Sequence, residues 1–204
     1  MQDDSQSTVS EHKHSLLDGW NSPPNFVTYI RILLVLVFIV LYARSGAWGQ
    51  NSLGMRWTAA TLFIVAASTD KLDGYLARKY NQVTELGKLM DPIADKLLII
   101  SALVIASIFG ELWWWATILF LLREIGITVL RFFIIDRGGQ VIAASPAGKF
   151  KTLFEFTGLA MLIAPLRSVG SWYLPLTQGI IVLALVLCLY SGGEYLYGVF
   201  GKRR

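Results

Sequence analysis

Six apolar stretches dominate this chain and set the strongest limit on how it folds. They lie at about residues 32–43, 57–69, 97–109, 112–135, 153–165 and 173–190, separated by polar or Gly/Pro-containing connections. A helix that crosses roughly 30 Å of hydrocarbon needs about 20 residues. With 54% hydrophobic and only 16% charged residues, the chain is too apolar for an ordinary soluble domain. We therefore expect an all-α integral membrane protein with six transmembrane helices.

The connections between these stretches are short, so we expect a single membrane domain over residues 1–204. A polar tail or surface helix is expected over residues 1–20, in the cytosol, and the six-helix core over about 24–198. Residues 1–24 lack the apolar segment that a cleavable signal peptide requires.

Basic residues predict the orientation of the helices, because they concentrate on the cytoplasmic side of membrane proteins. With the N-terminus inside, most of them lie on that side, including the terminal Lys202-Arg203-Arg204. The opposite loops then hold Arg44, Arg56 and Arg167. An aromatic belt at the outer interface would consist of Trp48, Trp57, Trp113, Trp114, Trp115 and Trp172.

Four aspartates lie where two predicted helices reach the membrane boundary. A helix that starts with the second apolar stretch must run for about 20 residues, so Asp70 and Asp73 belong to its end. Counted backward from the third stretch, Asp91 and Asp95 fall in the opening turns of the next helix, after a connection over residues 79–88. Carboxylates beside lipid are energetically expensive, so this cluster indicates a function.

The spacing of these residues predicts an all-oxygen site. At 100° per residue, a face of roughly 140° on the first helix holds Asp70, Asp73, Gly74, Ala77 and Arg78. Asp91 and Asp95 are four residues apart and share a face of the next helix. Oxygen ligands favour Mg²⁺ or Mn²⁺ over zinc, and two divalent ions would neutralise four carboxylates.

The same residues fit the pattern DxxDGxxARx8Gx3Dx3D at every position. This string resembles the signature of the CDP-alcohol phosphotransferases. The resemblance implies a six-helix membrane enzyme, usually a homodimer, with a polar cavity that faces the cytoplasm. Members of this family displace CMP from a CDP-linked lipid or alcohol by means of a second alcohol.

The resemblance also implies a role for each position. Asp70, Asp73 and Asp91 correspond to metal ligands, and Asp95 to a ligand that is also the general base. The opening Pro24-Asn25-Phe-Val-Thr28-Tyr-Ile-Arg31 resembles the PNxxTxxR start of the superfamily. Together, the residues expected to bind the CDP-lipid are Asn25, Thr28, Asp73, Gly74, Ala77, Arg78 and Gly87.

A second set of charged residues points to the acceptor. Arg123 and Arg131 are eight residues apart, about 80° around one helix, with Glu124 placed to orient or neutralise a neighbour. Lys149 and Lys151 follow at the start of the fifth helix. These four cations suit a second phosphate, and the stretches that hold them resemble those of phosphatidylglycerophosphate synthases, which use sn-glycerol 3-phosphate. The resemblance then implies that CDP-diacylglycerol is the donor. It also implies that the protein lies in the plasma membrane of a bacterium.

Other functions fit less of the pattern. Inositol phosphate would also need a cationic pocket, so a phosphatidylinositol-phosphate synthase is the first alternative. Phosphatidylglycerol, the acceptor of some cardiolipin synthases, lacks a phosphomonoester. A divalent-cation transporter should carry its aspartates near the bilayer midplane, and a purely structural protein has little use for them. Nucleic-acid binding would need an exposed basic face, and none is visible in the sequence.

Overall fold

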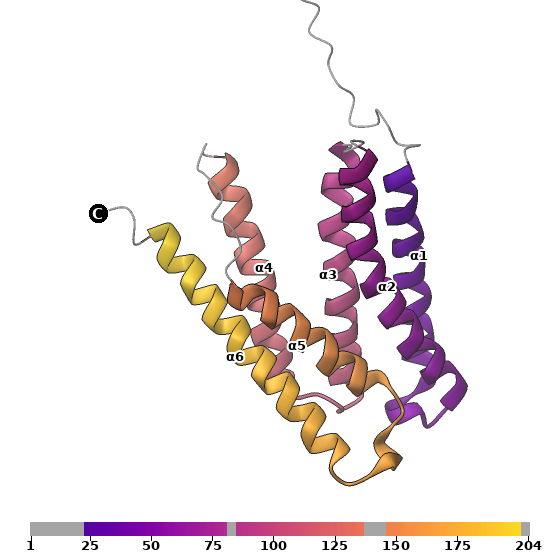
Figure 1. The fold of residues 1–204 in the computed structure, drawn as a ribbon. Coiled ribbons are helices and arrows are strands. Elements are labelled where there is room, and N and C mark those ends of the chain that lie inside the picture. Colours follow the sequence, from indigo (N-terminus) through magenta and orange to yellow (C-terminus); the bar gives the residue numbers. More distant parts are fainter. Residues whose placement is uncertain (1–22, 81–84, 137–145, 201–204) are drawn as a thin grey trace, which may run out of the picture.

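The computed structural model describes residues 23–80, 85–136 and 146–200, and this part of the chain is helical without a strand (Figure 1). Its α-helices are α1 (Pro23–Ser45), α2 (Leu53–Tyr80), α3 (Glu85–Ile108), α4 (Trp114–Asp136), α5 (Pro146–Ile163) and α6 (Tyr173–Phe200). Two short 3-10 turns, η1 (Ala47–Gly49) and η2 (Arg167–Val169), lie in the α1–α2 and α5–α6 connections. The prediction of an all-α chain with six helices is therefore confirmed for the described residues.

The helix boundaries differ from the prediction between α2 and α3. The sequence suggested a connection over residues 79–88, whereas α2 continues to Tyr80 and α3 already begins at Glu85. Gly87 consequently belongs to α3 and does not lie in a loop. Leu, Glu and Lys surround this glycine, and their helix propensity offsets the roughly 1 kcal/mol that a glycine costs inside a helix.

Two described segments are long and apolar enough to cross a membrane by themselves, Thr28–Ser45 in α1 and Tyr173–Val199 in α6. A shorter apolar segment, Lys96–Ile108, lies in α3. The other helices carry more charge within their length: α4, for example, contains Arg123, Glu124 and Arg131.

All six described α-helices contribute buried residues to the core of the bundle. Phe38, Phe63 and Phe156 pack in series with tilted rings, their centroids 5.6 and 5.7 Å apart, and so connect α1, α2 and α5. Buried residues of α3, α4 and α6 complete this core, among them Leu98, Phe120 and Leu185. The single cysteine, Cys188, is buried there, as expected for a residue that only packs.

The two ends of the bundle differ in chemistry. The α1–α2, α3–α4 and α5–α6 connections lie at the lower end in Figure 1, and this end carries Trp48, Trp57, Trp113, Trp114, Trp115 and Trp172. The start of α1, the end of α2 and the start of α3 lie together at the upper end. The predicted aromatic residues and the signature aspartates therefore belong to opposite ends.

A buried ion pair closes the tryptophan-rich end. Arg56, in the first turn of α2, is completely buried and lies 2.6 Å from Glu111 of the α3–α4 connection. Its Nε donates to the carbonyl of Ile163 at 2.6 Å, and Nη2 also donates to the carbonyl of Leu162 at 3.1 Å. Arg56 thereby caps the C-terminal end of α5, whose last carbonyls have no partner within the helix.

Glu111 extends this contact to two further elements. Its Oε2 accepts a hydrogen bond from Tyr42 of α1 at 2.9 Å, and its Oε1 accepts one from the backbone N–H of Trp48 in η1 at 2.6 Å. We call Arg56 and Glu111 the α2–α5 clamp. From the sequence, Arg56 was expected in an outer loop; it lies instead inside the bundle, in the first turn of α2, because Glu111 and the α5 carbonyls supply its partners.

We expect the substitution Glu111→Gln to destabilise the protein by about 3–5 kcal/mol, because it leaves the buried guanidinium of Arg56 without a counter-charge. The measurement is equilibrium denaturation of the purified protein in mixed detergent micelles. Glu194→Gln, at an exposed position on α6, is the matched control and should change the free energy of unfolding by less than about 0.5 kcal/mol. Equal stability of the two variants would contradict a structural role for the clamp.

Candidate functional site

The signature residues occupy the facing ends of two consecutive helices. Asp70, Asp73, Gly74, Ala77 and Arg78 lie in the last three turns of α2. The first three turns of α3 hold Gly87, Asp91 and Asp95. The end of α2 and the start of α3 lie at the same end of the bundle (Figure 1). The side chains of these eight residues lie outside the part of the chain whose side chains the structure describes.

The donor set fits a hard divalent cation. Four carboxylates on two adjoining helix ends offer only oxygen ligands, which Mg²⁺ and Mn²⁺ prefer. Among the side chains that are described, His, Cys, Asp and Glu form no group of three that could hold a metal ion.

The start of α1 brings further polar residues to this end. Asn25 lies in the first turn of α1, and its side chain is outside the described set. Thr28 and Arg31 follow one turn further on and are buried, with 1% and 0% of their surface exposed. Since α1 packs against both α2 and α3, these residues are near the helices that carry the signature.

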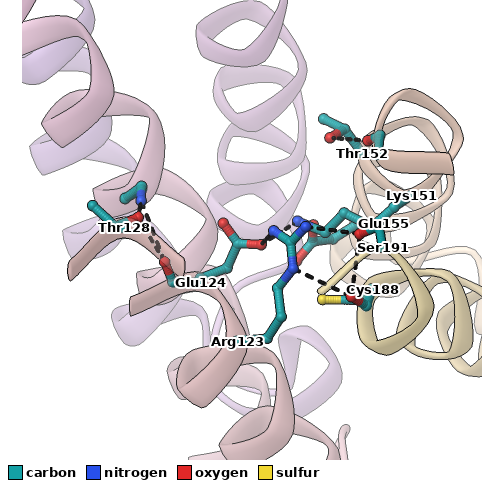
Figure 2. A network of polar contacts seen from close by, with 10 residues as sticks. Arg123, Glu124, Thr128, Lys151, Thr152, Glu155, Cys188 and Ser191 are labelled. Carbon is teal, nitrogen blue, oxygen red and sulfur yellow. Dashed lines mark hydrogen bonds and ion pairs between the residues drawn. The ribbon is translucent and has the colours of Figure 1, made fainter. Parts of the chain in front are cut away.

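Arg123 of α4 is held by three contacts in the network of Figure 2. Its Nη1 lies 2.7 Å from Oε1 of Glu124, and its Nη2 donates to the hydroxyl of Ser191 at 2.7 Å. Its Nε donates to the carbonyl of Cys188 at 3.2 Å. The guanidinium of Arg123 therefore ties α4 to α6, in a part of α6 that the sequence showed only as generic apolar helix.

Lys151 of α5 is held between two carboxylates (Figure 2). It pairs with Glu124 across the α4–α5 boundary and with Glu155, one turn along α5, at 2.7 Å. Lys151 and Glu155 are buried, with 4% and 1% exposed. The expectation that Glu124 neutralises a neighbour is confirmed, because this carboxylate contacts both Arg123 and Lys151.

Lys96 connects the network to α3. Its ammonium group donates to the backbone carbonyl of Glu124 at 3.4 Å and to the hydroxyl of Thr128. Lys96 follows Asp95 directly in the sequence, so one turn of α3 carries both a signature aspartate and a residue of the network. The backbone of α3 thus joins the two groups of residues.

The remaining two predicted cations differ from Arg123 and Lys151. Arg131 and Lys149 are exposed, and neither forms an ion pair with a described carboxylate. Arg131 lies over the ring of Tyr195 at 5.7 Å. The four cations therefore divide into two that carboxylates hold in place and two whose charge is uncompensated among the described residues.

Sequence reasoning missed Glu155, Ser191 and Lys96. A signal was present for Glu155, because it is an isolated carboxylate in an apolar helix, four residues after Lys151. Ser191 carries no comparable signal, since a serine within an apolar helix usually hydrogen-bonds its own backbone. Ser191 also does this, donating to the carbonyl of Cys188 at 3.2 Å.

Comparison with known proteins identifies relatives over most of the chain. A family model described as CDP-alcohol phosphatidyltransferase matches residues 21–190. A probable phosphatidylglycerophosphate synthase of Mycobacterium tuberculosis strain H37Rv is 40% identical over 174 residues, 84% of this chain and 78% of the relative. CDP-diacylglycerol–glycerol-3-phosphate 3-phosphatidyltransferases are 34% identical in Bacillus subtilis strain 168 (84% of this chain, 92% of the relative) and 33% identical in Salmonella typhimurium strain LT2 (87% and 94%).

We expect Lys151→Met to destabilise the protein by about 3–5 kcal/mol, because it leaves the buried carboxylate of Glu155 without its partner. Lys149→Met, two residues away and exposed, is the control, with an expected change of less than about 0.5 kcal/mol. Denaturation in mixed micelles measures both. The double variant Lys151→Met/Glu155→Leu should recover most of the loss; no recovery would contradict a pairwise interaction.

Proposed function

The chain belongs to the CDP-alcohol phosphatidyltransferase family, and from this premise we propose that it transfers the phosphatidyl group of CDP-diacylglycerol to sn-glycerol 3-phosphate. The products are phosphatidylglycerophosphate and CMP. The observation that carries this proposal is the identity of 33–40% to proteins named for this reaction, over 78–94% of their length. The complete signature on α2 and α3 supports the proposal, because its residues are the ones expected to bind the metal ions and the donor and to act as the base.

The proposed setting is the plasma membrane of a bacterium. All six α-helices cross the membrane, with the upper end in Figure 1 in the cytoplasm, where a water-soluble acceptor can meet a membrane-held donor. Two observations support this orientation: the tryptophans gather at the lower end, and the signature with its basic neighbours lies at the upper end. We also propose that two copies of the chain form a homodimer, as the family resemblance implies.

The aspartates have separate roles in the proposed reaction. Asp70, Asp73 and Asp91, together with Asp95, would hold two Mg²⁺ or Mn²⁺ ions, because two divalent ions balance the charge of four carboxylates. When bound, such ions stabilise the charge on the pyrophosphate during an in-line displacement. Asp95 also accepts the proton of the acceptor hydroxyl as general base.

Bond changes in this reaction balance without a covalent enzyme intermediate. The oxygen of the acceptor hydroxyl bonds to the lipid-side phosphorus, and the bond from that phosphorus to the CMP oxygen breaks. Gly74 and Ala77 leave room for the cytidine diphosphate against the backbone of α2, and Arg78 contacts its phosphates. The rest of the donor pocket consists of Asn25, Thr28, Asp73 and Gly87.

The four cations of α4 and α5 bind the phosphate of the acceptor. Arg131 and Lys149 are exposed, and no described carboxylate neutralises the charge that they bring to it. Arg123 and Lys151 contribute cationic groups that are already held in place before the acceptor binds. Their partners are Glu124, Glu155 and Ser191. A binding group whose own contacts are already made loses less conformational freedom when the ligand arrives.

The function is tested by the release of CMP from CDP-diacylglycerol with each candidate acceptor in turn. With Mg²⁺ or Mn²⁺, we expect release with sn-glycerol 3-phosphate and little with inositol phosphate or phosphatidylglycerol. A chelator should abolish the release, and the divalent ion should restore it. Release with inositol phosphate alone would replace the proposed product by phosphatidylinositol phosphate.

Asp95→Asn should reduce turnover by at least about 100-fold, because the amide cannot accept the hydroxyl proton. Binding of CDP-diacylglycerol, measured by titration of the purified protein, should change much less. Asp73→Asn is the comparison variant, since Asp73 is assigned to both metal and donor and should lose binding as well as turnover. Unchanged turnover in Asp95→Asn would exclude its role as the base.

Arg131→Gln should raise KM for glycerol 3-phosphate about tenfold and leave KM for CDP-diacylglycerol nearly unchanged, because it removes one charged contact to the acceptor phosphate. Arg44→Gln, also an exposed arginine but at the opposite end of the bundle, is the control. Steady-state kinetics with each substrate varied in turn measure both constants. A larger effect on the donor KM would assign Arg131 to the nucleotide pocket.

A further inference from the structure

A hollow of about 350 Å³ opens at the tryptophan-rich end of the bundle, away from the helix ends that carry the signature. It lies between η1 and the start of α2 on one side and the α5–α6 connection on the other. Its lining consists of Trp48, Leu53, Arg56, Ala164, Pro165, Arg167 and Ser168. Apolar walls with a few polar groups are typical of a small-molecule binding site, and the volume falls within the usual range of roughly 300–1,000 Å³.

Two arginines give this hollow its chemistry. Arg167 is exposed in η2, with its guanidinium 4.8 Å from the ring centre of Trp48, and no described carboxylate forms an ion pair with it. Its full positive charge is therefore available at the mouth of the hollow. Guanidinium groups that rest on aromatic rings are well placed to bind phosphate, because their N–H donors form a rigid planar fork.

Arg56 contributes a donor that the α2–α5 clamp does not use. Its Nε and Nη2 bond Ile163, Leu162 and Glu111, whereas its Nη1 is buried without a hydrogen-bond partner among the described residues. A buried N–H group without an acceptor is unfavourable, because its desolvation is not compensated by a hydrogen bond. Arg56 is one of the lining residues, so an anionic oxygen in the hollow would lie beside the guanidinium group that carries this donor.

We propose that this hollow binds a phosphate group, which in the membrane is the phosphodiester of an anionic phospholipid head group. Arg167 supplies the main charge, Arg56 the buried donor and Ser168 a hydroxyl. The apolar walls formed by Leu53, Ala164 and Pro165 would contact the glycerol part of the lipid. The site is separate from the proposed active site and does not depend on the proposed reaction.

The test is calorimetric titration of the full-length protein in a neutral detergent with two probes, dihexanoylphosphatidylglycerol and inorganic phosphate. Arg167→Gln should weaken the affinity for the bound probe about tenfold, which is the effect of losing one charge-assisted hydrogen bond. Arg167→Lys keeps the charge and should weaken this affinity less. Arg44→Gln, an exposed arginine at the same end that does not line the hollow, should bind like the wild type. CMP release should be the same in all four proteins.

The two probes identify the source of the phosphate. An effect of Arg167→Gln on the lipid probe alone supports a head-group site, and an effect on both probes supports a site that also accepts free phosphate. Unfolding temperatures without probe check that the variants are folded. Wild-type affinity of Arg167→Gln for both probes, or no binding of either probe by the wild type, would overturn the proposal.

Discussion

The bundle depends on one constraint, that a charge buried among apolar helices must find an opposite charge or a backbone carbonyl. The α2–α5 clamp meets this constraint at the tryptophan-rich end, where Arg56 joins Glu111 to the last carbonyls of α5. The Tyr42 hydroxyl and the backbone N–H of Trp48 donate further hydrogen bonds to the Glu111 carboxylate. One ion pair thus links α1, η1, α2, α5 and the α3–α4 connection; α2 and α3, which leads into that connection, carry the signature at the other end of the bundle.

The same constraint applies to the charged residues of α4 and α5, where it leads to a network of ion pairs. Lys151 lies between Glu124 and Glu155, and Arg123 is shared by Glu124 and Ser191, so that α4, α5 and α6 are joined through their polar side chains. Two of the four predicted acceptor-binding cations are therefore already neutralised inside the protein. Under the proposed function all four cations contact the acceptor phosphate: Arg123 and Lys151 from positions that their partners already fix, and the exposed Arg131 and Lys149 with charge that no described carboxylate neutralises.

Much of this arrangement could be predicted from the sequence, because it follows from helix length and local spacing. The continuation of α2 beyond Asp73 and the place of Asp95 in the first turns of α3 both follow from the number of residues that a spanning helix needs. The burial of Arg56 could not be predicted, since its partners lie 55 and 107 residues away in the chain. The roles of Glu155 and Ser191 likewise depend on how α5 and α6 pack against α4.

The central claim is that this chain joins a CDP-linked lipid to glycerol 3-phosphate through the free primary hydroxyl of the acceptor. It is tested most directly by supplying purified protein with CDP-diacylglycerol, Mg²⁺ and glycerol 3-phosphate labelled with ¹⁸O at its free primary hydroxyl, followed by mass spectrometry of both products. The account predicts that the label appears in phosphatidylglycerophosphate and is absent from CMP. A lipid fraction without the label, while CMP is released, would contradict it.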